Sequence, residues 1–111
     1  MIIREHPRLS VDDAALAALA DRFGIEELAL FGSVLRDDFM PTSDVDMLVT
    51  FEPDSPVRSL LDLIEVQQEL GALLRRRVDL VEPHLLHRFI REQVLADRRT
   101  IYVTPHRQRV S

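Results

Sequence analysis

Residues 31–46 read FGSVLRDDFMPTSDVD, and this stretch decides how the chain folds and where its chemistry lies. An apolar run ends in Gly32 and Ser33, and after ten further residues Asp44 and Asp46 stand on either side of a valine. A glycine that ends a buried strand lets a ligand approach the backbone. A serine there can donate its hydroxyl and amide groups while opening a short helix whose N-terminus attracts anions. The spacing therefore predicts a phosphate cradle that faces a pair of carboxylates.

The carboxylates in this pattern indicate a metal site. The segment VDMLVTF, residues 45–51, is rich in branched and aromatic residues and is predicted to be a central strand. Side chains alternate along a strand, so Asp44 and Asp46 would share one face, with Cα atoms about 6.5–7 Å apart. Oxygen ligands without histidine or cysteine favour magnesium, which usually binds one or two carboxylates plus substrate phosphates. Asp79, in the strand candidate at residues 78–82, would complete a two-metal arrangement or accept a proton if the two strands are neighbours.

Three helices are predicted from apolar residues at helical spacing. The first spans residues 10–24, with Ser10 as the expected N-cap. The second runs over residues 57–75, with Pro56 at its start, and the third over residues 84–98. Their apolar faces are expected to pack in the core, although a face left uncovered would be a binding surface. These faces comprise Leu16, Leu19, Ala20 and Phe23, then Val57, Leu60, Leu61 and Ile64, then Leu86, Phe89, Ile90 and Val94.

The order of predicted elements indicates the fold class. A buried strand is expected at residues 26–32, and residues 101–103 are a candidate last edge strand. Helices and strands then alternate as in an α/β (α+β) protein, with a small mixed sheet and helices packed on it. A chain of 111 residues with 46% hydrophobic residues suits one domain, residues 1–111, with a loose tail at 104–111.

Composition excludes several classes of function. The formal charge of −5, with 19 acidic and 14 basic residues, opposes nonspecific binding to a phosphate backbone. Long nucleic acid is therefore not an expected partner. The sequence has no cysteine, which excludes disulfides and thiolate zinc sites. It has no signal-peptide core and no apolar run of membrane-spanning length, so we expect a cytoplasmic protein without a membrane partner.

Two further groups of residues are expected to have structural roles. The basic run Arg75, Arg76 and Arg77 falls at the carboxyl end of the second predicted helix and would complement its dipole. Binding of a partner or a nucleotide by these arginines is the alternative. His84 and His87 are treated as ordinary polar positions, because no third ligand is plainly placed to finish a metal site with them.

The segment Phe31-Gly32-Ser33, followed after ten residues by Asp44-Val45-Asp46-Met47, resembles the signature of the minimal nucleotidyltransferase family. This family lies within the DNA polymerase beta superfamily and includes antitoxins. The resemblance spans about residues 24–103 and implies the nucleotidyltransferase fold. It implies that two magnesium ions are held by catalytic carboxylates and that the nucleotide is bound beside them. The catalytic and metal-binding residues would be Asp44, Asp46 and Asp79, and the nucleotide-binding residues Gly32, Ser33, Arg36 and Ser43.

The resemblance also implies a reaction and a partner. Family members transfer a nucleoside monophosphate from ATP or another nucleoside triphosphate to a hydroxyl group, and pyrophosphate leaves. Small members act as antitoxins that attach AMP to a tyrosine of a HEPN-type ribonuclease toxin, so a Mg²⁺-dependent protein adenylyltransferase is expected. Many relatives have Ala-Arg-Gly where this chain has Leu35, Arg36 and Asp37, and the added charge would weaken ATP binding. The alternative is a catalytically weak or inactive antitoxin that neutralises its toxin by binding and occlusion.

Overall fold

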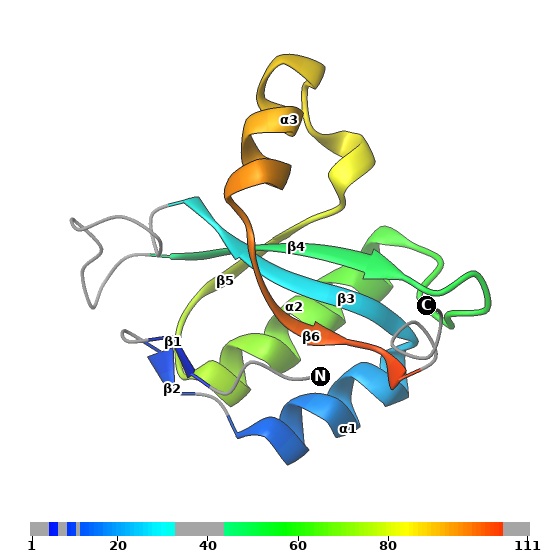
Figure 1. The fold of residues 1–111 in the computed structure, drawn as a ribbon. Coiled ribbons are helices and arrows are strands. Elements are labelled where there is room, and N and C mark those ends of the chain that lie inside the picture. Colours follow the sequence, from blue (N-terminus) through cyan, green and yellow to red (C-terminus); the bar gives the residue numbers. More distant parts are fainter. Residues whose placement is uncertain (1–4, 7–8, 11, 33–43, 106–111) are drawn as a thin grey trace.

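A four-stranded sheet, with two helices on one face and a third helix rising on the other side, forms the protein (Figure 1). The structure is a computed structural model that describes residues 5–6, 9–10, 12–32 and 44–105. Its strands are β1 (Glu5–His6), β2 (Leu9–Ser10), β3 (Ile25–Phe31), β4 (Val45–Phe51), β5 (Val78–Val81) and β6 (Arg99–Val103). Its helices are α1 (Asp13–Phe23), α2 (Leu60–Leu74) and α3 (Arg88–Asp97), and a 3₁₀ helix, η2, covers Pro83–Leu85.

The sheet is mixed, as the order of elements predicts. Its strand order is β5-β4-β3-β6, with β3 antiparallel to both β4 and β6 and β4 parallel to β5. Parallel strands need a long crossover connection, which α2 supplies between β4 and β5. The expected edge strand at residues 101–103 is confirmed as part of β6. A separate two-stranded hairpin of β1 and β2 was not predicted.

Alternation along β4 separates a core face from an open face. Val45, Met47 and Val49 are fully buried on the side covered by α1 and α2, and Asp46 therefore lies on the opposite face. The same alternation in β5 buries Val78 and leaves its neighbour exposed. The core cluster contains Leu16, Leu19, Ala20, Phe23, Ile25, Leu28, Leu30, Val45, Met47, Val49, Val66, Leu70, Leu74, Val78, Leu80, Ile101 and Tyr102.

The first helix begins later than the sequence suggested. Its N-cap is Asp12, whose carboxylate accepts a hydrogen bond of 3.1 Å from the Ala15 backbone N–H. Ser10, the predicted cap, instead belongs to β2. Gly24 ends the helix as expected, in the left-handed conformation with φ of 63°. The helix therefore spans residues 13–23 and places its predicted apolar face in the core.

In α2 the predicted apolar face is wrong. The helix begins at Leu60, after the N-cap Ser59, and not directly after Pro56; it ends at Leu74, within one residue of the predicted end. Its sequence contains two apolar stripes, and only one of them can face the sheet. Val66, Leu70 and Leu74 are buried. The stripe predicted to face the core is exposed to solvent at Leu60, Leu61 and Ile64.

The third predicted helix is split, and its apolar face is not core. η2 covers the first part, and α3 begins after His87, whose Nδ1 accepts a hydrogen bond of 3.2 Å from the Phe89 N–H. No residue of α3 is buried, and the Phe89 side chain is 76% exposed. Figure 1 shows the reason, because α3 stands off the sheet instead of lying on it. None of the helices that the structure describes is long and apolar enough to cross a membrane.

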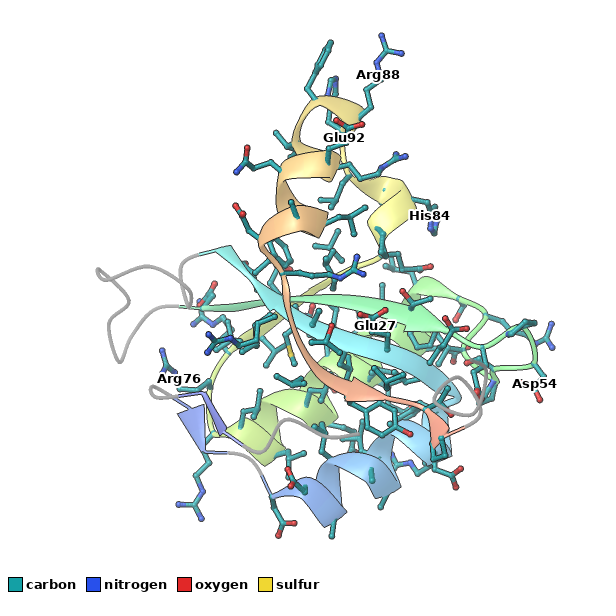
Figure 2. The ribbon with its side chains drawn as sticks, viewed as in Figure 1. Glu27, Asp54, Arg76, His84, Arg88 and Glu92 are labelled. Atoms are coloured by element: carbon teal, nitrogen blue, oxygen red, sulfur yellow. The ribbon has the colours of Figure 1, made fainter. Side chains whose placement is uncertain are left out.

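A buried glutamate links the C-terminal end of α3 to the sheet. Figure 2 shows Glu27 on β3, below α3. The Thr100 hydroxyl donates a hydrogen bond of 2.8 Å to its carboxylate, and the Nε of Arg98 lies 3.6 Å from the same oxygen. Because a buried charge is costly unless it is paired, these contacts fix where β6 and the end of α3 meet β3.

Two leucines of α2 test which stripe supports the fold. Leu70→Ala should lower the free energy of unfolding by about 2–5 kcal/mol, because it opens a cavity in the core at a fully buried position. Leu61→Ala, at a side chain that is 77% exposed, should change it by less than about 0.5 kcal/mol. Urea denaturation of both variants measures the difference. Equal losses would contradict the assignment of the core face.

Candidate active site

Three strand ends meet at one edge of the sheet and bring the predicted site residues together. Phe31, at the end of β3, pairs with Asp46 near the start of β4, and Asp46 pairs in turn with Asp79 near the start of β5. Gly32 follows Phe31 directly. Adjacent strands lie about 4.8 Å apart, so Asp46 and Asp79 are direct neighbours across the sheet. β4 and β5 are therefore neighbours, as the predicted approach of Asp79 to Asp46 requires.

Both aspartates point away from α1 and α2. Their chain neighbours Val45, Met47, Val78 and Leu80 are buried against α1 and α2, and side chains alternate along each strand. Paired positions of neighbouring strands share a face, so the two carboxylates lie on the open face together. Asp46 is half-buried and Asp79 is exposed, which leaves the pair accessible to a ligand.

Gly32 lies against the carboxylate of Asp46. Its φ is 75°, in the left-handed region that favours glycine. A Cβ at this position would overlap Oδ2 of Asp46 and lie 3.2 Å from its Cγ. Only the absence of a side chain therefore lets the end of β3 pass this close to the carboxylate. This cradle fits the predicted role of Gly32 in giving a nucleotide phosphate access to the backbone.

Asp44 directly precedes β4, two residues before Asp46, and contacts a basic residue. Its Oδ1 lies 3.8 Å from Nε of Arg77, and the Val45 N–H donates a hydrogen bond of 2.8 Å to the Arg77 carbonyl. The sequence analysis assigned Arg77 to a group that complements the helix dipole and did not place it at the site. Its spacing could have indicated this position, because Arg77 is two residues before Asp79 and shares its strand parity.

The donor set fits a hard divalent cation. Asp46 and Asp79 offer only oxygen ligands, and Gly32 contacts the Asp46 carboxylate without a side chain of its own. Within the described part of the chain, no three acidic or histidine side chains are already gathered as a metal-binding group. Asp46 and Asp79 are thus the residues that would hold magnesium first. Asp44 would join them by turning from Arg77.

Part of the predicted nucleotide site lies outside the described residues. Ser33, Arg36 and Ser43 fall in the segment 33–43, as do Asp37 and the short helix expected after Ser33. Their roles stay predictions. Of the described residues on either side of that segment, Gly32 contacts the Asp46 carboxylate and Asp44 contacts Arg77.

Comparison with known proteins agrees with this geometry. The family described as "Nucleotidyltransferase domain" matches residues 13–101. The chain belongs to this family. Protein adenylyltransferase MntA of Thermococcus cleftensis is 45% identical to it over 85 residues, which are 77% of this chain and 81% of that protein. A solved minimal nucleotidyltransferase is 37% identical and aligns with a TM-score of 0.63 over 82% of this chain and 88% of its own.

A more distant solved structure shares the fold. It contains a tri-AMPylated HEPN toxin from Shewanella oneidensis in complex with an MNT antitoxin. The matching chain is 20% identical to the present one, with a TM-score of 0.57 over 86% of this chain and 73% of its own.

The nucleotidyltransferase family match confirms the resemblance and the fold that the motif predicted. The family and the MntA likeness make the protein a nucleotidyltransferase with a nucleotide substrate. The roles of single residues rest on the motif and on the geometry above.

Replacing Gly32 tests the cradle. Gly32→Ala should lower the free energy of unfolding by about 1–2 kcal/mol, because a side chain is strained at positive φ. It should also abolish the rise in melting temperature that Mn²⁺ and a non-hydrolysable ATP analogue give the wild type, because the new methyl group displaces the Asp46 carboxylate. Thermal unfolding with and without both ligands measures this.

Ser55→Ala is the matched control for lost stability. The Ser55 hydroxyl donates a buried hydrogen bond of 2.6 Å to the Phe23 carbonyl, beyond the far end of β4. This variant should lose about 1 kcal/mol yet keep the full ligand-induced shift. A Gly32→Ala protein that keeps the shift would argue against the cradle.

Proposed function

We propose that the protein is an adenylyltransferase that transfers AMP from ATP to a hydroxyl group of a HEPN-type toxin and thereby acts as its antitoxin. The observation that carries the proposal is the cross-strand pair of Asp46 and Asp79 beside Gly32, within a nucleotidyltransferase domain. The likeness to the adenylyltransferase MntA supports AMP as the transferred group. We place the reaction in the cytoplasm, where ATP is abundant, in keeping with a sequence that lacks cysteine.

Each site residue has a role in this proposal. Asp44, Asp46 and Asp79 hold two magnesium ions, and Gly32, Ser33, Arg36 and Ser43 bind the nucleotide. Bound magnesium would neutralise the charge of the phosphates and orient them for in-line displacement. Asp79, the exposed carboxylate of β5, accepts the proton of the acceptor hydroxyl. The hydroxyl oxygen bonds to the α-phosphorus, the bond from that phosphorus to the bridging oxygen breaks, and pyrophosphate leaves.

The proposed partner is supported by a protein of the same fold. The Shewanella oneidensis structure contains a HEPN toxin that carries three AMP groups in complex with its MNT antitoxin. In the present chain the carboxylates lie on the face that α1 and α2 leave open, so an acceptor side chain of a partner can approach them without disturbing the core.

Binding without catalysis is the second candidate function. Leu85, Phe89 and Ile90 are exposed on η2 and α3, and exposed apolar groups of this kind favour a protein contact that does not depend on the carboxylates. An antitoxin of this type would block its toxin by occlusion and would tolerate loss of the aspartates.

Intact-mass measurement of the toxin separates the two functions. A HEPN-type toxin that forms a complex with the protein should gain the mass of one or more AMP units when it is incubated with the protein, ATP and Mg²⁺. A double variant, Asp46→Asn with Asp79→Asn, should reduce the rate of this gain by at least about a hundredfold, since it removes the metal-binding pair.

Asp54→Asn is the control, because Asp54 is an exposed acid in the turn after β4, at the far end of that strand in Figure 2. It should leave the rate unchanged. A stable complex without added mass would reject the transferase and support occlusion. Full activity of the double variant would reject the assigned carboxylates.

A further inference from the structure

Arg77 is the fourth charged side chain at the candidate active site. The parallel ladder pairs Val45 with Val78 and Asp46 with Asp79, so one residue earlier Asp44 stands opposite Arg77. The hydrogen bond from the Val45 N–H to the Arg77 carbonyl extends the ladder to this position. The arginine therefore has a backbone position as well fixed as those of the carboxylates.

Strand alternation puts all four side chains on the same face. Arg77 directly precedes β5, two residues before Asp79, and Asp44 directly precedes β4, two residues before Asp46. The 3.8 Å approach of Nε of Arg77 to Oδ1 of Asp44 agrees with this parity. The result is an array of two rows, in which Asp44 faces Arg77 and Asp46 faces Asp79.

A structural role at the helix end does not account for Arg77. The residue that caps α2 is Arg75, whose backbone N–H donates to the Gly71 carbonyl. Arg77 is two residues beyond this cap and directly precedes β5. Its side chain is 83% exposed, so it fills no core position either. Its side chain instead contacts the carboxylate of Asp44.

We propose that Arg77 is a positioning residue that competes with the divalent cation for Asp44 and so sets the cation affinity of the site. The inference rests on the proposed metal-binding role of the three aspartates. A carboxylate paired with a guanidinium must leave it, at least in part, to coordinate a cation, and the two cations repel each other. An arginine stays charged at every physiological pH, so the competition is constant.

The exposure of the pair sets the size of the effect. Asp44 is 46% exposed and Arg77 83%, and exposed ion pairs of this length are weak. A divalent cation with phosphate ligands can therefore displace the guanidinium. The attraction between two unit charges about 4 Å apart in a water-like dielectric corresponds to about a fivefold change in an equilibrium constant. The cost of breaking the Arg77–Asp44 pair would therefore weaken cation binding about fivefold. Arg77 would thus keep cation binding weak until the nucleotide adds its own phosphate ligands.

Titration of the full-length protein with Mn²⁺ alone, followed by the paramagnetic resonance of free Mn²⁺, tests the proposal without any turnover. Arg77→Gln should bind Mn²⁺ about fivefold more tightly than the wild type. Arg77→Lys keeps the charge and should stay within about twofold of the wild type. Arg75→Gln removes the same charge from the same arginine run and should also stay within about twofold.

The remaining outcomes separate this inference from the proposed function. Unchanged or weaker Mn²⁺ binding by Arg77→Gln would overturn the role of Arg77. The carboxylate site would still stand if Asp46→Asn abolished binding. Mn²⁺ binding that survives in Asp46→Asn and Asp79→Asn, or that is absent from the wild type, would overturn both the role of Arg77 and the carboxylate site. Circular dichroism of each variant checks that it is folded. Arg75 and Arg77 are exposed, so their replacement should not disturb the core.

Discussion

The register of β4 against its two neighbours is the constraint on which the site depends. It sets Asp46 opposite Phe31 on one side and Asp79 on the other. A slip by one residue would turn Asp46 into the face that α1 and α2 cover and would expose Val45 and Met47 to water. The hydrophobic core therefore holds the carboxylates in place, although none of its side chains belongs to the site.

The strands and the carboxylate pair were predictable because both depend on a period of two residues. The bounds of β4 agree with the sequence pattern, and β5 differs from it by a single residue. Once Asp46 and Asp79 lie on neighbouring strands with buried flanking residues, their common face follows from alternation alone. What the pattern could not supply was the pairing of β4 with β5, which depends on the crossover through α2.

Helix faces were predicted less well, for a physical reason. A helix of fifteen residues can carry two apolar stripes, and the sequence does not say which stripe meets the sheet. In α2 the buried stripe contains Leu70, not Leu61. Arg77 was missed for a different reason. The basic run does follow the end of α2, but only Arg75 caps that helix, and Arg77 directly precedes β5 and shares the parity of Asp79.

The two faces of the sheet have different roles. One face is committed to the core, so substrates can reach Asp46 and Asp79 only from the other face. In Figure 1 α3 stands on that open side, where Glu27 and Arg98 link its end to the sheet. The apolar side chains of α3 do not pack in the core and are exposed on this side. A partner that presents an acceptor group to the carboxylates, as we propose, would approach the same side of the sheet on which these side chains are exposed.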